Sequence, residues 1–192
     1  MRPKTERPAA SARWKSSVAA APGKAKKSAV ARPARVKQVK QKPGVSVHSF
    51  RTMLRTAPLI KRVLIERDGV PHQVVQGLIK EIGVSSSDFQ RYVRIPKATF
   101  TKKMKDKSLF AGTTGQSMVG LMDLINKVED MLAAEKDNPK AQHFDVQKWV
   151  GHWIERPQPA LGGLAPAEMM DTPTGRESVM KVLGAIQSGA YQ

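Results

Sequence analysis

The amino-acid sequence predicts an all-α protein with a disordered basic tail (residues 1–47), a helical middle domain (48–136) and a small helical C-terminal domain (137–192). Three observations predict it. Beyond residue 48, apolar residues recur at the three- and four-residue spacing of a helix face. Prolines and glycines separate these stretches and set the ends of short helices. The tail has no such apolar face and is rich in Lys, Arg, Ala and Pro.

Composition narrows the class of protein. The chain has 192 residues, and 33 Lys and Arg against 16 Asp and Glu give a formal net charge of +17. It contains no cysteine, which excludes disulfides, thiolate metal sites and cysteine nucleophiles and suits a reducing cytoplasm. No apolar run is long enough to span a bilayer. We therefore expect a cytoplasmic protein without a membrane partner.

The tail carries most of the charge. Residues 1–47 hold thirteen Lys and Arg and one acidic residue, Glu6, whereas the remaining 145 residues hold twenty basic and fifteen acidic residues. With Trp14 as its one aromatic residue, the tail cannot bury enough surface to offset the entropy of ordering. We interpret it as an arm that follows a phosphate backbone and binds by counterion release. A solubilising leader and an organelle transit peptide stay open as alternatives.

Short helices are expected between residues 48 and 83. Residues 49–67 form one or two helices interrupted by Pro58, Asp68-Gly69 forms a turn, Pro71 opens the next helix and Gly83 ends it. The apolar residues of the first stretch are Phe50, Leu54, Leu59, Ile60, Val63, Leu64 and Ile65, and those of the next helix are Val74, Val75, Leu78, Ile79 and Ile82.

The next segment has a helix-turn-helix pattern. A cluster of N-cap residues, Ser85 to Asp88, leads into a short helix with Phe89 and Tyr92 on one face. Residues 94–97 interrupt this helix, and a second one follows over residues 98–105. Two short helices with a turn of about three residues, and buried positions before, within and after the turn, are typical of this motif.

The exposed face of the second helix is the candidate DNA-reading surface. If Phe100 and Met104 face the core, the opposite face carries side chains that contact base edges and phosphates in a major groove, and the preceding helix reaches flanking phosphate. The candidate DNA-binding residues are Arg91, Arg94, Lys97, Ala98, Thr99, Thr101, Lys102 and Lys105. A lysine-rich helix that is only solvated, or that serves mainly in dimerisation, is the alternative.

A longer helix follows, capped by residues 113–115 (Thr-Thr-Gly) and running to Ala134. Its apolar stripe indicates a core helix that also contributes to a homodimer interface. The stripe consists of Met118, Leu121, Met122, Ile125, Val128 and Leu132. Residues 135–138 form a polar turn, and Pro139 opens the next helix.

The C-terminal segment begins with two tryptophans. Trp149 and Trp153 are four residues apart, so on a helix they share a face and bury aromatic area together. Residues 156–159 (Arg-Pro-Gln-Pro) stop that helix. Residues 162–163 (Gly-Gly) reverse the chain, and Pro166 opens another helix.

The final helix is predicted from four apolar residues spaced i, i+3, i+4, i+7: Val179, Val182, Leu183 and Ile186. Thr174 and Glu177 are typical of a capping box, and Gly189 of a C-terminal stop. Residues 190–192 would then present an aromatic ring and a free carboxylate to a partner. A frayed terminus is the alternative.

This segment resembles the toxin-binding domain of the Xre/MbcA/ParS antitoxins. That family has a tryptophan, a Pro-x-Pro-Ala-Leu-Gly-Gly run, a short helix opened by proline and followed by threonine, a glycine, and a last helix closing on Gly-x-Tyr. Here those are Trp153, Pro157 to Gly163, Pro166 to Met170, Thr172, Gly175 and Gly189-Ala190-Tyr191. Residues 94–104 also resemble the second half of the family's Xre-type helix-turn-helix, with Arg94 where glycine is common.

The resemblance implies an antitoxin of a type II toxin–antitoxin system. Its partner would be a RES-domain toxin, which hydrolyses NAD or ADP-ribosylates a protein. The middle domain would dimerise and bind operator DNA to repress its own operon. The chain's end would fill the toxin's NAD pocket, with Tyr191 stacked where a nicotinamide or adenine ring lies and the carboxylate paired with arginine. The residues assigned to toxin binding are Trp153, Pro159, Leu161, Gly162, Gly163, Gly189, Ala190, Tyr191 and Gln192.

The sequence gives no sign of catalytic, metal or cofactor chemistry of its own. His143 and His152 lie on opposite sides of one helix, so they do not converge on a metal. Glu168 and Asp171 are interpreted as a solvated edge. The chain is therefore expected not to be an enzyme. A solitary DNA-binding regulator or nucleoid-associated protein, and an enzyme acting on nucleic acid or nucleotides, are the alternatives.

Overall fold

The computed structural model describes residues 44–134 and 143–189 of the chain. Within these ranges the chain forms helices and turns and no β-strand, which confirms the all-α class. The tail up to residue 43, the turn and proline expected over residues 135–139, and residues 190–192 lie outside the described residues. No helix in the described part of the chain is long and apolar enough to cross a membrane.

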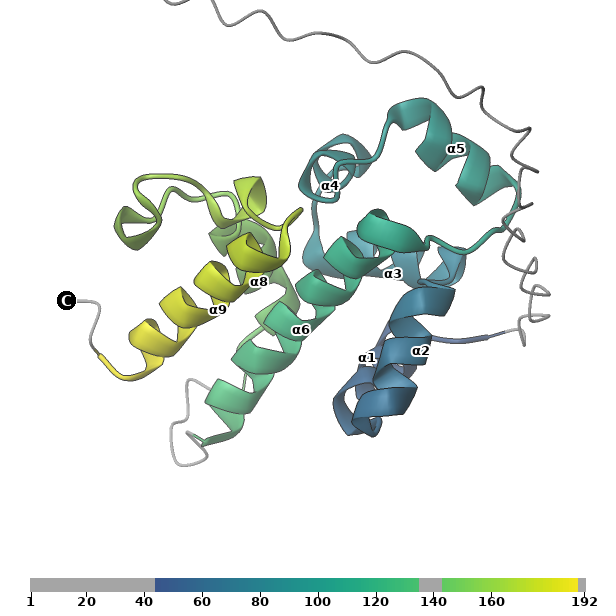
Figure 1. Ribbon diagram of the computed structural model, residues 1–192. Helices are drawn as coiled ribbons and strands as arrows, with labels where there is room; N and C mark the ends of the chain where they lie inside the picture. The colour runs from purple at the N-terminus through teal and green to yellow at the C-terminus, as the bar shows by residue number, and fades with distance from the viewer. Residues whose placement is uncertain (1–43, 135–142, 190–192) are drawn as a thin grey trace, which may run out of the picture. The chain divides into compact units, whose positions relative to one another are not determined.

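Figure 1 shows the helices and their labels. In chain order they are α1 (Val47–Thr56), α2 (Leu59–Asp68), α3 (His72–Ile82), α4 (Ser86–Tyr92), α5 (Lys97–Lys105), α6 (Gly112–Ala134), α8 (Val146–Trp153), the 3-10 helices η1 (Pro159–Leu161) and η2 (Pro166–Glu168), and α9 (Pro173–Gln187).

Serine, proline and glycine residues set the breaks between the first helices. The Ser49 N–H donates to Ser46 Oγ at 3.1 Å, which caps α1. Pro58 then separates α1 from α2, so the predicted interruption is confirmed. Pro71 precedes α3, and Gly83, with φ of 71°, ends it.

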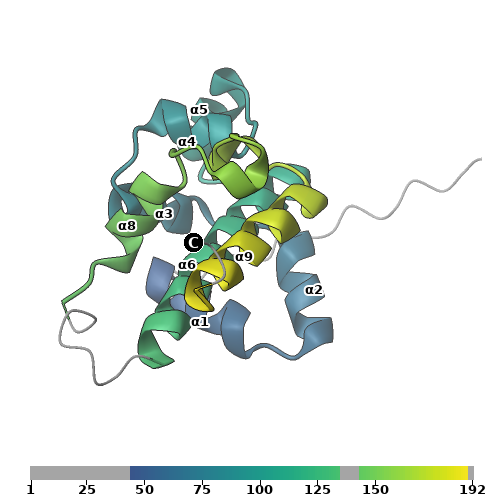
Figure 2. The same ribbon diagram turned by 90° about the vertical axis from the view of Figure 1, so that its left-hand side faces the viewer.

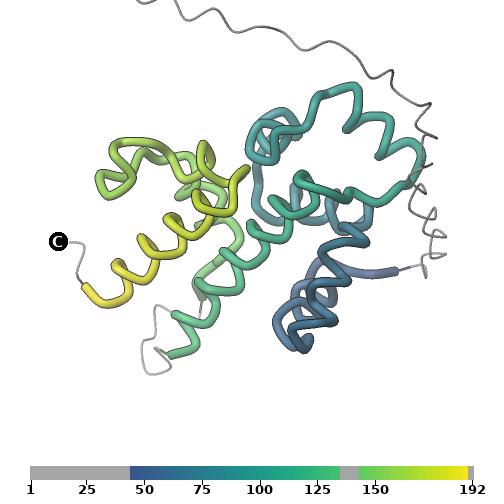
Figure 3. The backbone as a smooth tube through the Cα atoms, in the orientation of Figure 1, coloured from purple at the N-terminus to yellow at the C-terminus, as the bar shows by residue number. Residues whose placement is uncertain are grey.

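The central helix of the core is α6. Its predicted stripe is buried at Met118, Leu121, Met122, Ile125 and Val128, and Leu132 is half-buried against the same core. Helices α1, α2, α8 and α9 all pack against α6. In the view of Figures 1 and 3, α2 and α9 lie on opposite sides of it.

The start of α6 differs from the prediction. The helix begins at Gly112, so residues 113–115 form its first turn and not its cap. An antiparallel bridge between Val70 and Phe110 fixes the chain just before this point, and Gly112, with φ of 72°, turns it. Gly115 packs so closely that a Cβ there would lie 2.3 Å from the carbonyl oxygen of Phe110.

The cap of α9 also differs from the prediction. The Gly175 N–H donates to Thr172 Oγ1 at 3.0 Å, so the cap is Thr172 and not Thr174. Pro173 explains the shift, because its fixed φ favours the first position of a helix and leaves the residue before it as the cap. The Glu177 carboxylate pairs with the lysine one turn further on at 2.8 Å and closes no capping box. The predicted apolar face is buried at Val179, Val182 and Leu183 and half-buried at Ile186.

The segments on either side of residue 136 share one hydrophobic core. Helix α8 packs against α3 as well as α6 (Figure 2), and α9 packs against α6. Where α8 crosses α3, a Cβ on Gly151 would lie 2.0 Å from the carbonyl oxygen of Ile82, so this approach requires glycine. The domain boundary at residue 136 stays a prediction.

Candidate functional site

Helices α4 and α5 have the geometry that the sequence predicts. The Asp88 N–H donates to Ser85 Oγ at 3.1 Å, which caps α4. Phe89, Tyr92 and Ile95 are buried before and within the turn, and Phe100 is buried after it. The polar side of α5 is thereby turned away from the core.

Arg94 occupies the position where glycine is common in the resembled helix-turn-helix, and it adopts the backbone that glycine favours. Its φ is 46°, in the left-handed region. The Arg94 N–H donates to the Arg91 carbonyl at 3.2 Å, and the Ile95 N–H to the Gln90 carbonyl at 3.0 Å, which is the Schellman pattern of a helix end. Lys107 ends α5 in the same way, with φ of 50°. The departure from glycine therefore leaves the turn intact.

The predicted DNA-reading face of α5 is exposed. The exposed residues include Lys97, Ala98, Thr99, Thr101, Lys102 and Lys105, and α5 contains no acidic residue. Lys103 instead turns inward, where its Nζ donates to the Leu109 carbonyl at 2.8 Å and lies 5.6 Å from the centroid of the Phe110 ring. The outward face therefore offers hydroxyls and ammonium groups to a polyanion.

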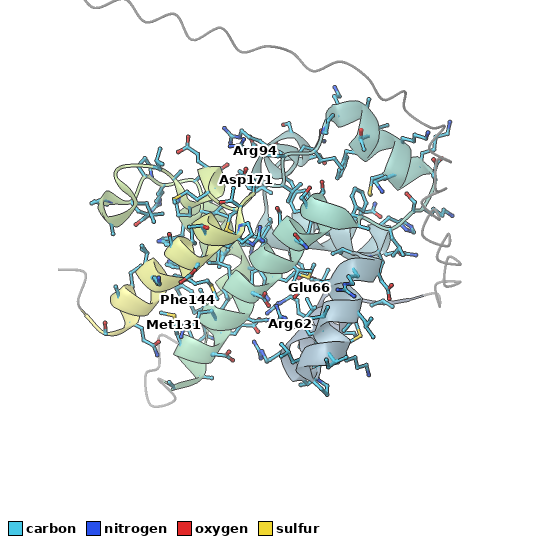
Figure 4. All side chains as sticks on the ribbon, in the orientation of Figure 1. Arg62, Glu66, Arg94, Met131, Phe144 and Asp171 are labelled. Atoms are coloured by element: carbon cyan, nitrogen blue, oxygen red, sulfur yellow. The ribbon has the colours of Figure 1, made fainter. Side chains whose placement is uncertain are left out.

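The two arginines of the predicted set each pair with carboxylates, and both side chains stay 70% exposed. Arg94 Nε lies 2.9 Å from Asp171 Oδ2, and both side chains are labelled in Figure 4. Arg91 lies 3.1 Å from Asp88 and 3.8 Å from Glu155. Phosphate contact by these arginines stays a prediction, and it would have to compete with these carboxylates.

A groove of about 890 Å³ lies between the α4–α5 turn and the loops that follow α8. Tyr92, Arg94 and Pro96 line one wall, and Glu155 and Glu168 line the other. The Tyr92 hydroxyl donates to the Glu155 carboxylate across it. Burial, with the hydrogen bond to Glu155 and its negative charge, raises the pKa of the Tyr92 hydroxyl well above its ordinary value.

The solvated edge expected at Glu168 and Asp171 is wrong for Asp171. Its side chain is 18% exposed and pairs with Arg94. Glu168 is exposed, and its carboxylate accepts from the Ala165 N–H at 2.9 Å, at the start of η2. Sequence reasoning missed the pairs of Asp171 and Glu155 because their partners are more than sixty positions away and no local spacing connects them.

The predicted toxin-binding residues divide into buried and exposed positions. Trp153 and Leu161 are buried. Trp153 stacks on Trp149 with ring centroids 5.6 Å apart and an interplanar angle of 12°, which confirms the shared face. Phe144, labelled in Figure 4, continues this aromatic row, with its ring centroid 6.0 Å from that of Trp149.

The exposed positions lie on a closed loop over residues 158–164. The Gln158 N–H donates to the Leu164 carbonyl, and the Gly163 N–H to the Gln158 carbonyl, each at 3.0 Å. Gly162 and Gly163 have φ of 68° and 83°, which confirms the predicted reversal. Pro159, Gly162, Gly163 and Leu164 are exposed along the loop. Buried Leu161 anchors it against α9, because η1 packs on that helix.

The last predicted positions follow α9. Gly189 is exposed with φ of 71°, which confirms the predicted helix stop. Ala190, Tyr191 and Gln192 lie outside the described residues. Within residues 44–134 and 143–189, no three His, Cys, Asp or Glu side chains come together to hold a metal ion.

Comparison with known proteins shows which proteins the chain is similar to. Residues 142–189, which include α8, the loop and α9, match the family model of the antitoxin Xre/MbcA/ParS C-terminal toxin-binding domain. A protein named Prs ADP-ribosylating antitoxin from Sphingobium sp. (strain YBL2) is 26% identical over 151 residues, which are 79% of this chain and 92% of that protein. A protein named Antitoxin Xre from Photorhabdus laumondii subsp. laumondii is 22% identical over 125 residues, which are 65% of this chain and 77% of that protein.

Proposed function

We propose that this chain, an Xre/MbcA/ParS-type antitoxin, neutralises a RES-domain toxin by occluding its active site and binds operator DNA to control its own operon. One observation carries the proposal: the match to a toxin-binding domain covers residues 142–189, where the exposed loop and Gly189 lie. The chemistry belongs to the partner, and this chain acts by binding. We expect both events to take place in the cytoplasm.

Contact with the toxin is assigned to the 158–164 loop and to residues 189–192. Exposed Gly162 and Gly163 have no side chains, so a partner backbone can approach the loop closely. Trp153 and Leu161, which are buried, would contribute indirectly by stabilising the conformation of the loop. The Sphingobium relative carries ADP-ribosylation in its name, which favours ADP-ribosyl transfer over NAD hydrolysis as the partner's reaction.

The test of toxin neutralisation is co-expression with the product of the adjacent gene, followed by co-purification and an assay of NAD consumption. We expect a stable complex with silent NAD chemistry, and activity when this chain is removed. Deleting residues 190–192 should restore NAD consumption while the complex persists. Tyr191→Ala should do the same, whereas Tyr191→Phe, which keeps the stacking ring, should stay silent. Full neutralisation by the deletion would contradict occlusion by this segment.

DNA binding is assigned to α5. Replacing Lys97, Lys102 and Lys105 together with alanine should weaken binding to operator DNA and lower the slope of log K against log salt by about 2 to 3, because each phosphate contact contributes roughly 0.9. Fluorescence anisotropy over a salt series measures both. The matched control is Lys148→Ala with Lys181→Ala, two exposed lysines on α8 and α9 that pair with acidic neighbours. Equal losses in both variants would argue against α5.

A second candidate function is a solitary DNA-binding regulator or nucleoid-associated protein. The basic face of α5 and the charge of residues 1–47 favour it. In that case no adjacent gene encodes a toxin, co-expression yields no complex, and deleting residues 1–43 removes most of the salt-dependent binding to DNA. An enzymatic function would require turnover by the purified chain alone that is lost on changing Glu168 or Asp171.

A further inference from the structure

The groove between the α4–α5 turn and the loops that follow α8 is not used by the toxin and DNA contacts proposed above. Its volume of about 890 Å³ lies in the range of small-molecule sites. Apolar side chains line part of it, namely Ile95, Pro96, Pro157, Ala165 and Ala167. Charged groups line the rest, arginines from the α4–α5 turn and glutamates from the C-terminal segment. An apolar lining with a few convergent polar groups is the usual form of a ligand site.

Arg94 is oriented by the C-terminal segment and still has donors to offer. Its Nε lies 2.9 Å from Asp171 Oδ2, and the Asp171 side chain is only 18% exposed. Within residues 44–134 and 143–189, the two Nη groups of Arg94 have no hydrogen-bond partner. A guanidinium that is already oriented through one edge can bind an anion through the other edge at a lower entropic cost.

Arg91 adds a second guanidinium to the same groove. It lies 3.1 Å from Asp88 and 3.8 Å from Glu155, and both contacts use its Nη2 atom. Its Nε and Nη1 groups make no polar contact in the described part of the chain, so they remain for a ligand. Two guanidiniums that line one groove can take two neighbouring phosphates.

The opposite wall carries hydrogen-bond acceptors. Glu155 accepts from the Tyr92 hydroxyl, and Glu168 accepts from the Ala165 N–H at 2.9 Å. A carboxylate has about four lone-pair positions, so both glutamates can accept further hydrogen bonds. These positions suit hydroxyl groups, because a carboxylate repels phosphate. A ligand that reaches both walls therefore carries phosphate at one end and hydroxyls beside it.

We propose that this groove binds a nucleoside diphosphate. The two arginines hold the phosphates, the two glutamates accept from the ribose hydroxyls, and the apolar lining packs against the base. Other classes of ligand fit less well. An acidic peptide would meet the glutamates, a basic peptide would meet the arginines, and a single amino acid would leave most of the groove empty.

Isothermal titration calorimetry of the full chain tests the site with ADP, adenosine and inorganic diphosphate as separate probes. We expect one ADP per chain, bound at least about tenfold more tightly than adenosine or inorganic diphosphate, because only ADP reaches both walls. 2′,3′-Dideoxy-ADP should bind about tenfold more weakly than ADP, because the carboxylates lose the ribose hydroxyls as donors.

Two variants locate the binding in the groove. Arg94→Gly removes one guanidinium, leaves a residue that favours the backbone of this turn, and should weaken ADP binding about tenfold or more. Ala165→Phe fills part of the groove without changing any charge and should also weaken ADP binding. The matched control is Arg67→Gln, at an exposed arginine of α2 that does not line the groove, which should bind ADP as the parent chain does. Circular dichroism checks that each variant keeps the helical spectrum of the parent.

Three results would overturn the site. The first is that the parent chain does not bind ADP, even if Arg94→Gly weakens its binding to a DNA duplex, since the arginines would then serve the DNA backbone. The second is that Arg94→Gly and Ala165→Phe bind ADP as tightly as the parent chain. The third is that inorganic diphosphate binds as tightly as ADP, which would indicate general attraction of phosphate to a basic chain. Because toxin is absent from these titrations, each result leaves the proposed antitoxin function to its own tests.

Discussion

Arg94 and Lys107 show how one residue can meet two demands. Each ends a helix of the α4–α5 pair in the left-handed region, where a side chain is strained and glycine is not. Each also places a positive charge at a helix C-terminus, where the helix dipole favours it. Arg94 in addition reaches Asp171, which glycine could not do. Arg94 therefore adopts a strained backbone conformation and, in the same position, forms an ion pair with the C-terminal segment.

Substitution at Arg94 should separate these effects. Arg94→Gly removes the strain and the ion pair, whereas Arg94→Ala removes the ion pair and keeps the strain. We expect the glycine variant to be more stable than the alanine variant by about 1 kcal/mol. The ion pair itself should contribute little, because the Arg94 side chain is 70% exposed. Urea unfolding measures the difference, and equal stability of the two variants would contradict a strained turn.

Gly151 is required because α8 and α3 pack too closely at this position for a side chain. Gly151→Ala would place a Cβ 2.0 Å from the Ile82 carbonyl, against backbone that cannot move aside cheaply. We expect a loss of about 2 kcal/mol or more in the free energy of unfolding. The matched control is Gly184→Ala on α9, which meets nothing within 4 Å and should gain about 1 kcal/mol from helix propensity. A tolerated Gly151→Ala would mean that α8 and α3 can move apart.

Among the elements, the helices were predictable and their exact starts were not. Proline, glycine and apolar spacing are local signals, so the break at Pro58, the α4–α5 pair and the stacked tryptophans are confirmed. The start of α6 depends on a bridge between Val70 and Phe110, which are far apart in the sequence. The exposure of Leu59, Ile60, Val63 and Leu64 on α2 was not predicted either.

The cap of α9 gives a test at the element scale. Thr172→Ala removes the oxygen that accepts from the Gly175 N–H and should cost about 1 kcal/mol. Thr174→Ala, two residues on in the first turn, should change stability by less than about 0.5 kcal/mol. Thermal unfolding followed by circular dichroism distinguishes them. A larger loss of stability for Thr174→Ala than for Thr172→Ala would instead favour the capping box of Thr174 and Glu177 that the sequence predicts.

At the scale of the whole molecule, the candidate functional surfaces were only partly predictable. The exposed face of α5 and the glycine loop follow from spacing and composition. The groove between them does not, because Tyr92 and Arg94 meet Glu155 and Asp171 only after α8 has packed on α3. Tertiary contacts, which no sequence motif predicts, place the two candidate functional surfaces on either side of this groove.

The shared core predicts a single unfolding transition for the described helices. A Trp14→Phe variant leaves Trp149 and Trp153 as fluorescent probes of α8, while circular dichroism reports all the helices. We expect the two signals to change at the same urea concentration, because helices on both sides of residue 136 pack on α6. Two separate midpoints would instead show that the 48–136 and 137–192 segments fold independently.

The close approach of Gly151 to Ile82 also bears on how such proteins can be recombined. Consider a chimera in which the α1–α6 segment of this chain is followed by the C-terminal segment of a relative. Its α8 must still pack closely on α3, and that contact depends on residues from both segments. We expect the chimera to fold only if the incoming segment brings glycine at 151, where α8 meets the α3 backbone. If the 158–164 loop contacts the toxin as proposed, a change of toxin specificity is therefore better made by grafting this loop than by exchanging the domain.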